Sequence, residues 1–236
     1  MMNFSKPPPP TSITLATLPS TATIRRCLYR DLDRILPIYN HYITHTIVSL
    51  DLDPKPLVYM QRLYNDTLDQ DLPFLVVTRN DNHDPAQNRE DDIVGYAYAH
   101  YYRRLPAFGG TVEILIYLDP DATGQGIGEK LLKVLVEMLR AVTPGTDRDH
   151  GVRTVLAIVP EDGEGDANLR QVLSKFFLKG GFEDRGLLKG VAWKMGKWID
   201  TRSFQLSLDD EPKNEEKAMQ KRAPKRRWWS SLFRRR

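Results

Sequence analysis

The stretch from Thr111 to Lys133 places an apolar run, a turn, a glycine-spaced loop and an amphipathic segment in direct succession. Residues 112–118 are apolar except for Glu113 and predict a strand, and the residues after Gly128 repeat apolar side chains at helical spacing. Backbone N–H groups at the start of a helix favour an anion, and glycines let a ligand approach them closely. The succession therefore restricts the chain to an α/β fold and predicts a cradle for a phosphate.

The spacing of the glycines decides which phosphate loop this is. A dinucleotide-binding loop needs G-x-G-x-x-G, whereas Gly124, Gly126 and Gly128 give G-x-G-x-G, and a P-loop needs Lys where Glu129 follows. The acetyl-CoA loop of the GNAT acetyltransferases has the pattern Arg/Gln-x-x-Gly-x-Gly/Ala, which residues 123–128 resemble except at Thr123. A glycine-rich turn that only joins a strand to a helix is the remaining alternative.

The composition excludes several classes of protein. A single cysteine, Cys27, rules out an internal disulfide framework and favours a reducing compartment, so we expect a cytoplasmic location. No apolar run approaches the length of a membrane span, and the N-terminus lacks the pattern of a secretory signal. His41 and His45 are four residues apart but have no third ligand in view, so no metal site is predicted.

The two ends of the chain differ from its middle. Residues 1–21 are rich in Pro, Ser and Thr and predict a disordered arm, and residues 209–236 predict a disordered tail, which leaves one domain at 22–208. Residues 221–236 hold eight lysines and arginines and no acid, more than the net charge of +3, so the remainder is mildly acidic. This basic and aromatic end has three interpretations: a solvated tail, a nuclear-import or nucleic-acid patch, or a peripheral anchor on anionic membranes.

The order of the expected elements defines the fold class. Strands are expected at 23–28, 74–78, 93–101, 112–118, 152–159, 182–193 and 198–206. Helices are expected at 32–43, 55–69, 127–139 and about 168–179, the first of them capped by Asp31. Polar insertions at 80–92, 143–150 and 160–167 separate some of these elements. This order predicts a single-layer mixed α/β sheet of about seven strands flanked by about four helices.

Short stretches spread along residues 22–207 resemble the phosphinothricin acetyltransferase branch of the GNAT superfamily. They are Ile38–His41 with Thr46 and Ser49, Gly95–Ala99, Arg104–Phe108, Thr111–Glu113, Tyr117, Pro120–Ala122, Gly124–Gly128 and Val191–Thr201. The last is the most specific, because it is close to that branch's Gly-Trp-Lys-x-Gly-x-Trp-x-Asp ending. The resemblance implies transfer of acetyl from acetyl-CoA to the primary amine of a small molecule, an amino acid or an analogue, by a homodimer.

The resemblance also implies a set of site residues. It implies that Glu113 is the catalytic base and that the central strand splays from the next strand to admit the pantetheine arm. The residues implied to bind acetyl-CoA are Ile116, Tyr117 and Leu118 through their backbone, then Gly124, Gln125, Gly126, Ile127, Gly128, Glu129 and Asn168. The residues implied to contact the substrate are Arg104, Pro106, Ala107 and Phe108.

Glu113 also draws attention on chemical grounds alone. An amine attacks a thioester only as the neutral species, so a base must accept its proton. A carboxylate among the apolar residues of 112–118 should have a raised pKa, which suits that role. The alternative interpretation is a solvent-facing glutamate on an alternating strand.

Besides Thr123, the chain departs from the family pattern at three positions next to the predicted site. Phe177 stands where relatives place a Tyr or His acid, Leu115 replaces a serine, and Glu129 replaces a basic residue that Lys130 or Lys133 could stand in for. These changes predict a reduced rate. They also keep open two alternatives, a peptide or protein N-acetyltransferase and a non-catalytic CoA-binding module tethered by the tail.

Overall fold

The computed structural model describes residues 22–79, 92–103, 105–142, 151–162 and 167–208, with side chains left out at 167–169. The predicted arm and tail, most of the three polar insertions and Arg104 lie outside these residues. The described chain forms one seven-stranded sheet in the order β1-β2-β3-β4-β5-β7-β6. All seven expected strands and all four expected helices are present in the expected order.

The strands differ from their predicted bounds by a few residues. They are β1 (Ala22–Arg26), β2 (Phe74–Arg79), β3 (Asp92–Tyr101), β4 (Thr111–Leu118), β5 (Thr154–Glu161), β6 (Glu183–Lys194) and β7 (Lys197–Ser207). Neighbouring strands run antiparallel except for β4 and β5, which are parallel. A parallel pair needs a crossover, and α3 supplies it.

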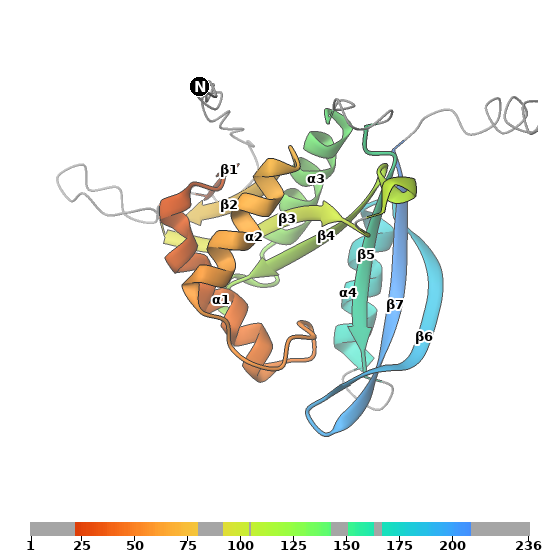
Figure 1. The fold of residues 1–236 in the computed structure, drawn as a ribbon. Coiled ribbons are helices and arrows are strands. Elements are labelled where there is room, and N and C mark those ends of the chain that lie inside the picture. The colour runs from red at the N-terminus through yellow and green to blue at the C-terminus, as the bar shows by residue number, and fades with distance from the viewer. Residues whose placement is uncertain (1–21, 80–91, 104, 143–150, 163–166, 209–236) are drawn as a thin grey trace, which may run out of the picture.

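Helices cover both faces of the sheet, as Figure 1 shows. They are α1 (Leu32–His45), α2 (Leu57–Asp69), α3 (Ile127–Arg140) and α4 (Ala167–Lys179), with single turns η1 (Tyr29–Asp31), η2 (Pro106–Phe108) and η3 (Pro120–Ala122). One core packs α1 and α2 against the sheet, and a second packs α3 and α4 against the opposite face. The two-sided cover explains why β2 is a continuous run of buried residues rather than an alternating one.

The predicted cap of α1 is wrong. Asp31 occupies the N-cap position but makes no side-chain capping bond to that helix. Its carboxylate instead accepts hydrogen bonds from the Arg25 guanidinium, at 2.6 and 3.0 Å, and from the backbone N–H of Leu28, at 2.7 Å. The ion pair across the β1–η1 connection is mostly buried, and it holds the carboxylate away from the helix start.

The centre of the sheet opens after a short pairing between β4 and β5. The two strands pair only at Thr111 with Thr154, Val112 with Val155 and Glu113 with Leu156, and no later pair joins them among the described residues. From there β4 continues to pair with β3, and β5 continues to pair with β7. The strands therefore diverge immediately after Glu113, as expected for the splayed sheet.

Candidate functional site

The backbone of β4 alternates between its two neighbours. Tyr102 donates to the carbonyl of Thr111 at 3.1 Å, and Asp119 donates to the carbonyl of Val94 at 2.9 Å, so the odd-numbered residues of β4 bond to β3. The even-numbered residues, including Ile116 and Leu118, direct their N–H and C=O groups to the side where β5 has diverged. The predicted backbone contacts are thus favoured at Ile116 and Leu118, because the backbone groups of Tyr117 face β3.

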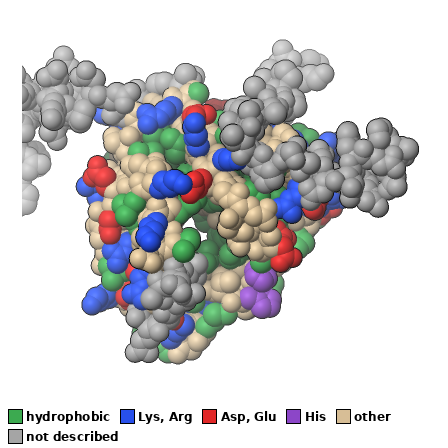
Figure 2. All heavy atoms as spheres, turned by 180° about the vertical axis from the view of Figure 1, so that it is seen from behind, with side chains coloured by type: hydrophobic (Ala, Val, Ile, Leu, Met, Phe, Trp, Pro, Cys, Tyr) green, Lys and Arg blue, Asp and Glu red, His purple; other side chains and the backbone are tan. Residues whose placement is uncertain are grey.

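A cavity of about 530 Å³ lies at this opening. Figure 2 shows the α3 and α4 face hollowed near its centre, with hydrophobic side chains around the opening. The residues of β4 and β5 that line the cavity are Ile114, Leu115, Ile116, Tyr117, Leu118, Ala157, Ile158, Val159 and Pro160. A buried backbone donor without a partner costs about 1–3 kcal/mol, so the exposed edge of β4 favours a ligand that can hydrogen-bond to it.

Tyr42 is a cavity residue that sequence reasoning missed. Its hydroxyl donates to the carbonyl of Leu118 at 2.8 Å, and its ring packs against Tyr117, with ring centroids 5.2 Å apart. The carbonyl of Leu118 is therefore occupied by α1, which leaves its N–H and the backbone of Ile116 facing the cavity. No motif includes Tyr42. The helical spacing of the apolar residues of α1 is the only sequence signal that could have placed it facing the sheet.

The glycine loop meets the cavity at its other end. Gly124 and Gly126 have φ of +72° and +74°, a conformation that favours glycine, and a Cβ at either would meet open space. A Cβ at Gly128 would lie 3.3 Å from the ring of Phe176, so this glycine allows α4 to pack against the first turn of α3. These three glycines are predicted site residues, and Gly124, Gly126 and Gly128 all line the cavity.

The two predicted loop residues between the glycines point elsewhere. Ile127 is fully buried in the core beneath α3. The side chain of Gln125 accepts a hydrogen bond from Arg79 at 2.8 Å and donates one to the carbonyl of Asp121 at 3.0 Å. Their backbone N–H groups, rather than their side chains, are what they could offer to an anion at the helix start.

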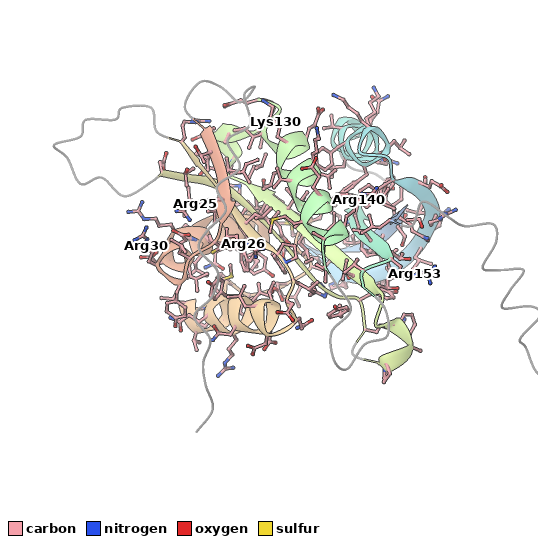
Figure 3. All side chains as sticks on the ribbon, turned by 90° about the horizontal axis from the view of Figure 1, so that it is seen from above. Arg25, Arg26, Arg30, Lys130, Arg140 and Arg153 are labelled. Carbon is pink, nitrogen blue, oxygen red and sulfur yellow. The ribbon has the colours of Figure 1, made fainter. Side chains whose placement is uncertain are left out.

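Glu129 is held by a cation that the sequence did not indicate. Both carboxylate oxygens of Glu129 accept hydrogen bonds from Lys179 of α4, at 2.7 and 2.8 Å. Lys130 lies on the first turn of α3 in Figure 3, and Lys133 pairs with Glu137 at 4.0 Å. The neighbouring helix thus supplies the cation that pairs with Glu129, and the idea that Lys130 or Lys133 replaces the missing basic residue stays a prediction.

Glu113 lies just beyond the cavity, on the same face of β4 as Leu115 and Tyr117. Its side chain is 22% exposed, and its carboxylate lies 3.9 Å from Nε2 of His100, its partner residue on β3. Burial raises the pKa of Glu113, and His100 lowers it in part. The raised pKa agrees with the chemical expectation for a base. His100 is a second residue that sequence reasoning missed, because only the strand register brings it to Glu113.

The predicted substrate residues occupy the turn before β4. Pro106, Ala107 and Phe108 form η2, and the first two are exposed. The guanidinium of Arg103 lies over the ring of Phe108, 5.5 Å from its centroid. The turn leads into β4, which begins at Thr111, two residues before Glu113. The turn and Glu113 therefore lie at the same end of β4. Arg104 and the side chain of Asn168, also predicted site residues, lie outside the described part.

Phe177 lines the cavity from α4. It is 8% exposed, and its ring packs against Phe182 and Phe204, with centroids 5.4 and 5.3 Å away. Phe177 therefore stands where a proton donor could act on a group in the cavity, yet its ring has no proton to give.

The described ranges hold no group of three or more His, Cys, Asp or Glu residues that could bind a metal ion. Among the same residues, no helix combines the length and the apolar character needed to cross a bilayer.

Comparisons with known proteins agree with one another. Residues 38–148 match the profile of the family described as Acetyltransferase (GNAT) family. The chain is 30% identical over 189 residues to a methionine sulfoximine/methionine sulfone acetyltransferase of Pseudomonas aeruginosa, covering 80% of this chain and 96% of the relative. It is 30% identical over 206 residues to a phosphinothricin N-acetyltransferase of Alcaligenes faecalis, covering 87% and 92%.

A solved structure extends the likeness to the fold. The crystal structure of a phosphinothricin acetyltransferase from Sinorhizobium meliloti in complex with AcCoA superposes with a TM-score of 0.64. The two sequences are 28% identical, and the match covers 79% of this chain and 88% of the other. The mixed sheet with its helices on both faces is therefore shared.

Proposed function

Because the chain belongs to the GNAT acetyltransferase family, we propose that it moves the acetyl group of acetyl-CoA to the primary amine of an amino acid or an amino-acid analogue. The observation that carries the proposal is the divergence of β4 from β5, with Glu113 at one end and the glycine loop at the other. The stretch from Glu113 to Leu118 spans about 17 Å of extended strand, enough to lie beside an extended arm. Relatives named for phosphinothricin and methionine sulfoximine support the substrate class.

The proposed chemistry divides between the two ends of β4. Glu113 takes the proton of the attacking amine, and a backbone N–H that faces the gap stabilises the oxyanion that develops on the thioester carbonyl. The C–N bond forms first and gives this oxyanion, whose collapse restores the carbonyl and breaks the C–S bond. The departing thiolate takes its proton from solvent, because the ring of Phe177 has no acidic proton. A thiolate is a good leaving group, so this arrangement lowers the rate without stopping the reaction.

A panel of amines tests the proposal directly. Purified protein is mixed with acetyl-CoA and with phosphinothricin, methionine sulfoximine, methionine sulfone or free amino acids, and in parallel with short peptides, and the release of free thiol is followed. Turnover with one of these amines supports the proposal. Turnover only with peptides would favour the protein N-acetyltransferase alternative. Binding of acetyl-CoA without any turnover would favour the non-catalytic module. The replacement of a proton donor by Phe177 is the observation that favours this alternative.

The pH dependence follows from the surroundings of Glu113. The base must be ionised, and burial raises its pKa, so kcat/KM should fall as the pH drops through this raised value. His100 holds that pKa down, and His100→Gln removes its effect. We therefore expect the acidic limb of the pH profile to move to higher pH in His100→Gln. His45→Gln, at the exposed C-terminal residue of α1, is the control, and an unmoved limb in His100→Gln would contradict the role of this pair.

A homodimer is the second part of the proposal. The edge strand β6, its turn and the start of β7 expose five large apolar side chains, each 52–63% accessible: Leu188, Val191, Trp193, Met195 and Trp198. A long apolar edge strand invites pairing with another chain, and such a patch marks an interaction surface. A second copy of this chain that covered the patch would bury its apolar side chains and shield the open edge of β6.

Light scattering checks the dimer. Wild-type protein should have the mass of two chains, and Trp198→Glu should shift it towards one chain because a charge in a buried interface lacks a partner. Leu68→Glu, an exposed residue of α2, should leave the mass unchanged. A wild-type monomer at micromolar concentration would refute the dimer.

Location and tail complete the proposal. We place the protein in the cytoplasm, since its one cysteine, Cys27, is a buried free thiol. The tail at 221–236 lies outside the described residues, and its nuclear, nucleic-acid and membrane interpretations remain proposals. Binding to anionic liposomes by full-length protein but not by residues 1–208 would favour the membrane interpretation.

A further inference from the structure

The end of α4 is fixed against the start of α3. A Cβ at Gly128 would lie 3.3 Å from the ring of Phe176, and a Cβ at Gly180 would lie 2.7 Å from Leu132. Both close approaches depend on glycine. The last two turns of α4 therefore stand over the glycine loop.

This contact brings charges of both signs to one end of the cavity. Lys175 and Lys179 are one helical turn apart on α4, and both line the cavity together with Glu129 of α3. Lys179 binds both oxygens of Glu129, whereas Lys175 is exposed. Basic and acidic side chains lie around the opening in Figure 2.

Glu129 has opposite effects with and without a ligand. In the first turn of α3 a carboxylate complements the positive end of the helix dipole. A phosphate at the same helix start would meet that carboxylate as a like charge. The pair with Lys179 is solvent-exposed, with side chains 69% and 48% accessible, and exposed pairs are weak. Lys179 can therefore exchange one anion for another at little cost.

We infer that Lys179 and Lys175 bind the phosphates of the acyl-CoA donor and that Glu129 competes with those phosphates for Lys179. The inference rests on the proposed function, since it assigns the cations that hold the same donor. Lys179 leaves the Glu129 carboxylate and donates to a phosphate oxygen, while Lys175 adds a second positive charge one turn away. The role that a basic residue at the start of α3 would have is thus carried by the neighbouring helix.

Two single substitutions should act in opposite directions. Calorimetry with CoA should show about tenfold weaker binding for Lys179→Met, because one charge-assisted hydrogen bond is lost. Glu129→Gln should bind CoA several-fold more tightly, because the competing charge is gone. If the pair only joined the two helices, both changes would weaken binding alike. Lys133→Met, a surface lysine paired with Glu137, is the matched control and should bind as wild type does.

A donor without phosphates isolates the effect. With S-acetylpantetheine as the donor, kcat/KM should be the same for wild type, Lys179→Met and Glu129→Gln. In a separate measurement with CoA, the charge-swapped double variant Glu129→Lys/Lys179→Glu should bind at least as tightly as wild type. Equal CoA affinities for wild type and both single variants, or equal losses with both donors, would overturn the inference and leave the proposed function intact. Failure of wild-type protein to bind CoA at all would overturn both.

Discussion

Glu113→Gln is expected to lower kcat by about 10²- to 10⁴-fold, the range typical of removing a general base. Glutamine keeps the size of the side chain and cannot accept the proton of the amine. The carboxylate lies outside the cavity lining, so the affinity for acetyl-CoA should stay near that of wild type. Thiol release measured at saturating acetyl-CoA, together with calorimetry, separates the two quantities.

The matched control for Glu113→Gln is Glu137→Gln, which alters an exposed carboxylate on α3. It should leave kcat unchanged. If Glu113→Gln retained wild-type kcat at neutral pH, the amine would lose its proton to solvent or to another group, and the assignment of the base would fail. At high pH, where more of the amine is already neutral, the difference between the two enzymes should narrow.

Gly126→Val is expected to lower the affinity for acetyl-CoA by at least about a hundredfold, because two charge-assisted bonds worth about 1.5–3 kcal/mol each would be misdirected. Gly126 has a φ of +74°, which a β-branched residue adopts only at a cost of about 1–2 kcal/mol. The loop should therefore move and carry its N–H groups away from the phosphates. Calorimetry with acetyl-CoA measures the loss.

A second glycine controls for strain alone. Gly196, in the turn between β6 and β7, has a φ of +76°, and a Cβ there would also meet open space. Gly196→Val and Gly126→Val should lower the unfolding temperature by similar amounts, because both place a β-branched residue at a positive φ. Gly196→Val should leave the affinity for acetyl-CoA unchanged. Equal losses of affinity in both variants would mean that stability, rather than the loop, controls binding.

The order of the elements could be predicted from the sequence because each element carries its own periodic pattern. The apolar run of β2 and the helical spacing of α3 are local signals, and both elements appear where expected. The divergence of β4 from β5 followed from the family resemblance instead. No local pattern in either strand shows where their pairing ends.

The contacts that were missed join residues distant in the chain. Lys179 reaches Glu129 from fifty residues away, and only the packing of α4 over Gly128 brings them together. His100 meets Glu113 through the register of β3 and β4, which the intervening turn sets. Asp31 is an exception, since its ion pair with Arg25 spans only six residues, yet it too replaces the capping bond that the local pattern predicted. Pattern reasoning finds elements, and it does not find which side chains tertiary packing pairs.

The three-residue pairing between β4 and β5 makes a narrow seam between the two halves of the sheet. Beyond it, a bound donor could hydrogen-bond to the backbone of Ile116, which pairs with no residue of β5. The donor would then take the place of a pairing strand along this part of β4, and it would be replaced in each catalytic cycle. Amide hydrogens along this edge should exchange slowly with solvent only while a donor is in place, and the stiffness of the whole sheet would vary with the supply of its own substrate.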